Sequence, residues 1–239
     1  MRVLSCRAMP RRKLVVTPSL PYHLTSRSNN REWFYLPLPE VHAIFREQLV
    51  AAAARYPFVL NAAVLMSNHF HLIAQFGETP VDVVMRYLLT ETSRRIQKRA
   101  GRMNHVFGSR YKWSLLESPH AVAFVYEYVL RNPVRAGLCT RVEDWPYSSA
   151  RFSAEQPFSI ADGVGELWSR VLKRFSERLA WLNAPPRSLE EEALIRKSLR
   201  REVFVLSRSN AARESVQSLC ESYGVAPVDT RYLLGPKGD

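Results

Sequence analysis

Residues 58–76 read FVLNAAVLMSNHFHLIAQF, and this stretch decides the fold. Two apolar runs of strand length flank the pair Ser67-Asn68, whose residue types favour tight turns. Two such runs joined by a two-residue turn are typical of a β-hairpin. We therefore predict strands at 58–66 and 69–76.

The second of these strands begins with His69-Phe70-His71. Because side chains alternate along a strand, the two histidines share one face and Phe70 points to the other. Two imidazoles roughly 7 Å apart on one face are able to chelate a single cation. The alternative is a pair of strand histidines held by ordinary hydrogen bonds. No cysteine or third histidine stands at short spacing, so a closed zinc site is not indicated.

Outward from the hairpin, apolar periodicity and turn residues predict the other elements. Gly101 stands where a helix ends in a left-handed residue. Ser118-Pro119 supplies an N-cap and a first helical proline, and Pro133 disfavours helical geometry at Asn132. The elements predicted besides the hairpin are strands at 22–26 and 111–116 and helices at 39–55, 81–100 and 119–131. Their order is the split βαβ pattern of an α+β, ferredoxin-like antiparallel sheet, with one helix appended.

After Trp145–Ser149 the sequence pattern changes, and amphipathic spacing predicts only helices. These helices are predicted at 165–182, at 188–201 (with a capping box of Ser188 and Glu191) and at 209–223. The last two either read duplex DNA as a pair, or pack on the main domain or on a second copy. We divide the chain into a basic N-terminal arm at 1–19, a ferredoxin-like domain at 20–155 and a helical C-terminal extension at 156–239.

The 239-residue chain carries a formal net charge of +12. Such charge argues for a polyanionic partner, because each phosphate that a protein neutralises releases condensed counterions. No apolar stretch approaches the roughly 20 residues of a membrane-spanning helix, and the basic start lacks the apolar run of a secretory signal. Cys6, Cys139 and Cys220 stand apart, so no disulfide framework is indicated. We expect a cytoplasmic protein without membrane contact that binds nucleic acid.

Positive charge is concentrated between residues 86 and 112, where Glu91 is the only acid. A solvated helix face is one interpretation, although such faces usually mix both signs. Tyr111 and Trp113 lie between these charges and could stack on unpaired bases or belong to the core. The candidate DNA-binding residues of this segment are Arg95, Arg99, Arg102, Arg110 and Lys112.

Tyr128 and Asn132 are four residues apart, so they share a helix face. Asn132 offers an amide oxygen, which suits Mg²⁺ or Mn²⁺ beside the imidazoles of His69 and His71. Tyr128 would then lie beside the metal, which relieves charge repulsion between a phosphodiester and an attacking phenol. The phosphotyrosine that forms retains a phosphodiester bond, so rejoining needs no ATP. The alternative is that Tyr128 is an ordinary half-buried residue of a packed helix.

At these positions the sequence resembles the REP-associated tyrosine transposases, which belong to the single-tyrosine HUH (insertion-sequence 200-like) transposases. The similarity runs from about Pro10 to Phe152, with several motifs in the family's order. The motifs are PYHLT at 21–25, SNNR at 28–31, MSNHFHL at 66–72, GSRYK at 108–112, YVLRNPVRAG at 128–137 and WPYSS at 145–149. The family often has Gly where Ser28 stands and Pro where Ser67 stands.

The resemblance implies a metal-dependent transposase that nicks and rejoins single-stranded DNA near hairpins such as REP palindromes. It implies that His69, His71 and Asn132 bind the metal. It also implies that Tyr128 attacks the phosphate, which leaves a 5′-phosphotyrosine and a free 3′-hydroxyl. The SNNR motif adds Asn30 and Arg31 to the candidate DNA-binding residues. Related enzymes are monomers or dimers that share the tyrosine helix, so a homodimer stays open.

Two other functions fit these residues. A non-catalytic RNA- or DNA-binding module of ferredoxin-like fold would share the element order and the basic surface, but the aromatic signatures of such sheets are absent. A plain metallohydrolase would use water in place of Tyr128, and it would cleave DNA without a protein-linked band.

Overall fold

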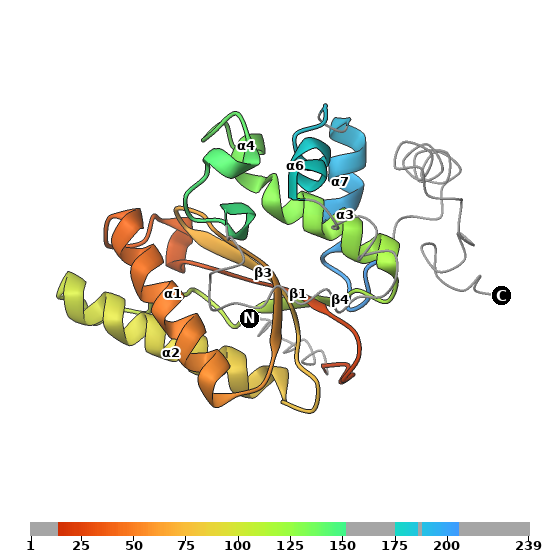
Figure 1. The fold of residues 1–239 in the computed structure, drawn as a ribbon. Helices are drawn as coiled ribbons and strands as arrows, with labels where there is room; N and C mark the ends of the chain where they lie inside the picture. The colour runs from red at the N-terminus through yellow and green to blue at the C-terminus, as the bar shows by residue number, and fades with distance from the viewer. Residues whose placement is uncertain (1–13, 152–174, 186–187, 206–239) are drawn as a thin grey trace, which may run out of the picture.

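The structure, a computed structural model, describes residues 14–151, 175–185 and 188–205. Its centre is one antiparallel sheet of four strands in the order β2-β3-β1-β4 (Figure 1). Helices follow β1 and β3, which is the predicted split βαβ arrangement, so the α+β, ferredoxin-like prediction is confirmed. The elements are β1 (Tyr22–Arg27), α1 (Leu38–Arg55), β2 (Val59–Leu65), β3 (His69–Gln75), α2 (Val81–Ala100), β4 (Lys112–Leu115) and α3 (Pro119–Leu130).

The β2–β3 hairpin forms as predicted. The backbone N–H of Met66 donates to the carbonyl oxygen of His69 at 2.8 Å, across the turn at Ser67 and Asn68. β3 then pairs with β1 on its other side, so His71 lies opposite Thr25 in the interior of the sheet. A residue on an interior strand is held by neighbours on both sides, which suits a site that needs fixed geometry.

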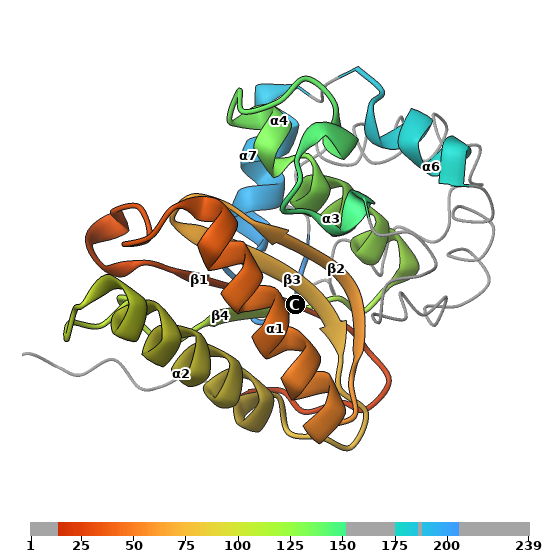
Figure 2. The same ribbon diagram turned by 60° about the vertical axis from the view of Figure 1, so that its left-hand side comes forward.

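Helices cover both faces of the sheet (Figures 1 and 2). Alternation along β3 sends Phe70 and Leu72 into the core beneath α1 and α2, whereas Ile73 joins the core beneath α3. With both faces covered, β2 is buried along nearly its whole length and does not alternate between buried and exposed residues. The two histidines that flank Phe70 therefore point to the α3 face.

Later segments cover both edges of the sheet. At β2, the backbone N–H of Leu65 donates to the carbonyl oxygen of Tyr147, and Nε1 of Trp145 donates to that of Leu65, each at 2.9 Å. At β4, Leu115 pairs in parallel with Val203. Covered edges cannot pair with strands of other chains. The second of these contacts also brings the C-terminal part of the chain back to the sheet.

The helix that carries Tyr128 begins as predicted, because Oγ of Ser118 accepts a hydrogen bond from a backbone N–H of the first turn. α3 ends at Leu130, and the short helix α4 (Asn132–Arg135) follows it. The prediction that Pro133 keeps Asn132 out of helical geometry is therefore wrong. Pro133 occupies the first turn of α4, where a backbone N–H would have no partner within the helix.

The described part of the C-terminal region is helical, with α6 (Phe175–Leu182) and α7 (Leu189–Ser198). The capping box of Ser188 and Glu191 at the start of α7 is confirmed, and α7 packs against α3 (Figure 2). No helix of the described residues is long and apolar enough to cross a membrane. Outside these residues lie the arm up to residue 13, Cys6, most of the helix predicted at 165–182, the helix predicted at 209–223 and Cys220.

Candidate active site

The tertiary structure brings together the two motifs that the sequence analysis singled out. The rings of His69 and His71 have their centroids 5.0 Å apart, on the α3 face of the sheet. The ring of Tyr128 meets that of His71 edge-on, with 6.0 Å between centroids. All three side chains line one open cavity of about 910 Å³. The predicted convergence of phenol and imidazoles is therefore present in the fold.

Each of the two histidines has a hydrogen-bond partner at Nδ1. Nδ1 of His71 lies 2.8 Å from Nε2 of His23 on β1, and these two rings stack. Nδ1 of His69 lies 2.7 Å from Oδ1 of Asn68. Both contacts hold the ring orientation and leave Nε2 facing another group. Nδ1 of His69 donates to the amide oxygen, so its Nε2 carries the free lone pair, and Nε2 of His71 does so when its Nδ1 donates to His23.

Burial keeps both imidazoles uncharged at neutral pH. It lowers the pKa of His69 to about 4, with a further contribution from the charge of Arg27. Burial also lowers the pKa of His71 well below its ordinary value, and the neighbouring His23, His69 and Arg135 lower it further. Neutral imidazole is the form that binds metal ions.

Asn132 is held beside Tyr128 as the four-residue spacing predicted. Its Nδ2 donates to the backbone oxygen of Tyr128 at 3.0 Å, and the residue lines the same cavity as His69 and His71. Two neutral imidazoles and an amide oxygen suit a divalent cation such as Mg²⁺ or Mn²⁺. Among the described residues no group of three or more His, Cys, Asp or Glu side chains could hold a metal ion. Metal binding by His69, His71 and Asn132 stays a prediction.

The wall of the cavity is basic and includes several candidate DNA-binding residues. Asn30 and Arg31 stand in a loop with positive φ angles of 53° and 60°. Gly108 packs against this loop so closely that a Cβ atom there would lie 3.1 Å from Cα of Asn29. A Cβ atom at 108 would therefore require this loop to shift by a few tenths of an ångström. The polar and basic residues of the wall include Arg27, Asn30, Arg31, Arg110, Lys112, Arg135, Arg196 and Arg200.

The three candidate arginines of the α2 segment lie elsewhere. α2 packs on the face of the sheet opposite α3 (Figure 2). Arg95 forms an ion pair with an acid of its own helix at 2.7 Å, and Arg99 lies 3.7 Å from Glu40 of α1. The guanidinium of Arg102 lies 3.7 Å from the ring centroid of Tyr35. These residues have partners within the protein, and their contact with DNA stays a prediction.

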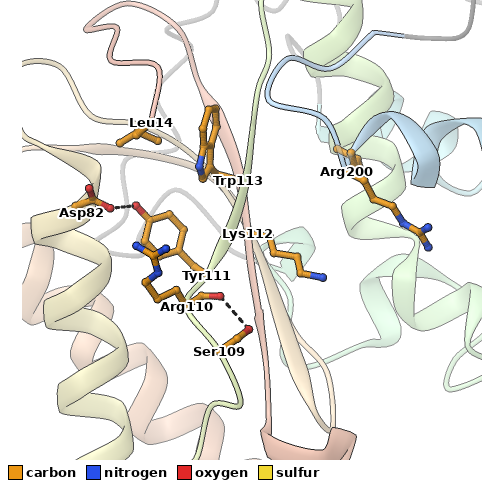
Figure 3. Close-up of a pocket in the computed structure, with 9 residues that line it drawn as sticks. Leu14, Asp82, Ser109, Arg110, Tyr111, Lys112, Trp113 and Arg200 are labelled. Atoms are coloured by element: carbon orange, nitrogen blue, oxygen red, sulfur yellow. Dashed lines mark hydrogen bonds between the residues drawn. The ribbon is translucent and has the colours of Figure 1, made fainter. Parts of the chain in front are cut away.

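β4 directs its side chains to two different surroundings, as Figure 3 shows. Tyr111 and Trp113 point to one side, where the hydroxyl of Tyr111 donates to Asp82 and both rings pack on the core. Lys112 points to the other side, toward Arg200. These residues line a second cavity of about 570 Å³ that adjoins the first one. Base stacking by Tyr111 or Trp113 stays a prediction.

The sequence analysis missed several residues of the site. His23 is buried on β1 between two core residues, and a lone imidazole in an apolar strand is the signal that marks it. Arg135 stands within the tyrosine motif but received no role. Glu192 and Arg196 come from α7 and Arg200 follows it, more than fifty residues after the tyrosine, and no local pattern indicates that they approach it.

The buried histidine on β1 predicts a loss of stability in acid. Burial lowers the pKa of His23 to about 3, whereas an unfolded histidine titrates near 6.5. As the pH falls through this window, the unfolded chain binds the proton first, so the free energy of unfolding decreases. Between pH 7 and pH 5 this contribution is about 2 kcal/mol. Urea unfolding of the metal-free protein in EDTA at the two pH values measures it.

In that experiment the free energy of unfolding should fall between pH 7 and pH 5 by about 2 kcal/mol less in His23→Gln than in the unsubstituted protein. His105→Gln is the matched control, because His105 is exposed. The same loss of stability in His23→Gln and in the unsubstituted protein would contradict the assignment.

The chain is similar in sequence to known proteins. Residues 16–132, about half of the chain, match the family model described as IS200-like transposase. A REP-associated tyrosine transposase of Escherichia coli (strain K12) is 26% identical over 132 residues, which cover 53% of this chain and 74% of the relative. A Haemophilus influenzae protein assigned to the same group is 28% identical over 116 residues, which cover 44% of this chain and 66% of that relative.

The fold has a counterpart among solved structures. A REP-associated tyrosine transposase bound to a REP hairpin matches with a TM-score of 0.52 and 18% identity, over 66% of this chain and 98% of that one. At this identity the match concerns the fold alone. Together with the family model and the two relatives, it confirms the resemblance seen in the motifs. Through residues 16–132, the chain belongs to the IS200-like transposase family.

Proposed function

We propose that this transposase is a metal-dependent strand transferase that nicks and rejoins single-stranded DNA beside hairpins, with Tyr128 as the nucleophile. The observation that carries the proposal is the 6.0 Å contact between the rings of Tyr128 and His71. A phenol that attacks a phosphodiester must lie beside the groups that hold and polarise that phosphate. The relative that was solved with a REP hairpin supports a hairpin as the substrate.

In the proposed reaction the hydroxyl oxygen of Tyr128 forms a bond to the scissile phosphorus as the P–O3′ bond breaks. The 5′-phosphate stays on the tyrosine, the phenol proton passes to solvent, and the leaving 3′-oxygen takes up a proton. Rejoining is the reverse, with a 3′-hydroxyl that attacks the phosphotyrosine. Asn132 holds the last turn of α3 through its bond to the backbone of Tyr128.

The metal ligands in this proposal are His69, His71 and Asn132, and the neutral imidazoles and amide oxygen suit Mg²⁺ or Mn²⁺. A bound cation would withdraw electron density from a non-bridging phosphate oxygen. His23 and Asn68 hold the two imidazoles in place through Nδ1.

The single strand is proposed to lie in the basic cavity, against Arg110 and Lys112. Arg110→Ala should weaken binding of a hairpin with a single-stranded flank severalfold. It should also reduce the slope of log affinity against log salt by about 0.7, since one phosphate contact is lost. Arg99→Ala removes the same charge from α2 and should leave both quantities nearly unchanged. Fluorescence anisotropy at several salt concentrations measures both variants, and the opposite ranking would move the DNA path to α2.

A denaturing gel separates the proposal from its alternatives. The protein is incubated with a hairpin labelled at its 3′ end and Mg²⁺ or Mn²⁺, because the phosphotyrosine retains the 3′ fragment, and part of the sample is digested with protease. The proposal predicts a labelled band of protein-linked DNA that protease removes. A non-catalytic binding module would leave the DNA whole, and a metallohydrolase would cut it without any protein-linked band.

We also propose residues 20–155 as the catalytic unit and residues 156–239 as the C-terminal extension. A homodimer and a cytoplasmic location stay predictions.

A further inference from the structure

The side chain of Arg135 lies against the proposed nucleophile. Its Cζ atom is 4.4 Å from the ring centroid of Tyr128. Its side chain is 18% exposed, and Nη1 is buried without a hydrogen-bond partner among the described residues. A guanidinium over an aromatic face is attracted by the ring, and this attraction grows when water is excluded. The positive charge of Arg135 therefore lies over the ring of Tyr128.

Glu192 of α7 holds this guanidinium in place. Oε2 of Glu192 lies 3.0 Å from Nε of Arg135, and the carboxylate side chain is only 14% exposed. An ion pair that is largely shielded from water is stronger than an exposed one, because water and salt screen it less. Glu192, Arg135 and Tyr128 also line one small pocket, which places the three side chains together.

α7 presents one face to the site. Glu192 and Arg196 are one turn apart on α7, and Arg200 follows just after the helix ends at Ser198. The two arginines line the large cavity together with Tyr128. The helix is fixed at both ends. Its capping box precedes it, and the pairing of Val203 with Leu115 of β4 follows it.

We propose that Arg135 and Glu192 are positioning residues for Tyr128, so that α7 of the C-terminal extension is an integral part of the strand-transfer site. The inference rests on the proposed role of Tyr128. Tyr128 stands near the end of α3, two residues before the helix ends at Leu130. The guanidinium covers one face of the ring while His71 meets the ring edge-on. Loss of either support lets the phenol leave the attacking position, and displacements of about 1 Å can cost up to a hundredfold in rate.

The test compares Glu192→Gln with Glu190→Gln. Glu190 stands on the same helix but is exposed, so its substitution removes the same charge without touching Arg135. Glu192→Gln should lower the single-turnover rate constant of covalent adduct formation by about tenfold and leave the Kd and KM for the hairpin unchanged. Glu192→Asp, which keeps the carboxylate, should retain more of the rate. Glu190→Gln should match the unsubstituted protein.

A double-mutant cycle with Arg135→Gln completes the test. If the two residues act as one unit, Arg135→Gln combined with Glu192→Gln should be no slower than the slower single variant. Thermal unfolding and circular dichroism of each variant separate a loss of folding from a loss of positioning.

Three results would overturn the inference. They are an unchanged rate in Glu192→Gln, a loss confined to hairpin affinity, and additive losses in the double variant. Failure of the unsubstituted protein to form any adduct would instead refute the proposed function of Tyr128.

Discussion

The Tyr128→Phe variant should form no covalent adduct with a hairpin and should lose cleavage by at least about a thousandfold, because the substitution removes the attacking oxygen itself. The ring stays in place, since its contacts with His71 and Arg135 involve the aromatic faces and edges and not the hydroxyl. Binding of the hairpin should therefore stay within about twofold of the original, since the substitution removes no charge. Single-turnover cleavage and anisotropy on the same DNA measure the two quantities.

Tyr126→Phe is the control for this experiment. Tyr126 stands two residues earlier on α3, but its ring is buried and stacks on Trp181, away from the cavity. The Tyr126→Phe variant should still form the covalent adduct, even where the substitution lowers the free energy of unfolding. A protein-linked DNA band from Tyr128→Phe would refute the assignment of the nucleophile.

Substitution of either strand histidine should have the second largest effect. His69→Ala and His71→Ala should each lower the cleavage rate at least about a hundredfold at low metal concentration, because loss of a direct ligand costs more than loss of its hydrogen-bond partner. Excess Mn²⁺ should restore part of the rate, since the remaining imidazole and Asn132 still offer ligands. Rates measured over a range of Mn²⁺ concentrations test both expectations.

His105→Ala serves as the matched control, because it removes an exposed imidazole outside the cavity. Its rate should follow that of the unsubstituted protein at every metal concentration. If the unsubstituted protein cleaves equally fast in EDTA, the metal role of both histidines is excluded.

Local patterns were sufficient for the main elements of the fold. The hairpin at 58–76, the cap at Ser118 and the left-handed Gly101 lie where the sequence predicted them, because turns, caps and apolar periodicity act over a few residues. The same local rules misjudged Asn132. Its conformation depends on a second helix, α4, that starts directly after α3.

The candidate DNA-binding residues show where local patterns end. Charge alone grouped Arg95, Arg99 and Arg102 with Arg110 and Lys112, since all five belong to one basic stretch. The fold separates them, because α2 packs beneath one face of the sheet, whereas Arg110 and Lys112, at the start of β4, line the cavity that contains Tyr128. The net charge follows from the composition, whereas packing decides on which surface the charged side chains lie.

The sequence by itself determined the strand that carries the imidazoles, the helix face shared by the phenol and the amide, and the sheet order that brings them near one another. The strand and the helix face follow from periods of two and of about four residues, and the sheet arrangement follows from the order of the elements along the chain. Only the tertiary structure decided that His23 supports His71 from the neighbouring strand, and that α7 returns to place Glu192 against Arg135. Such contacts join residues 48 and 57 positions apart, and no local period in the chain records which distant side chains will be packed together.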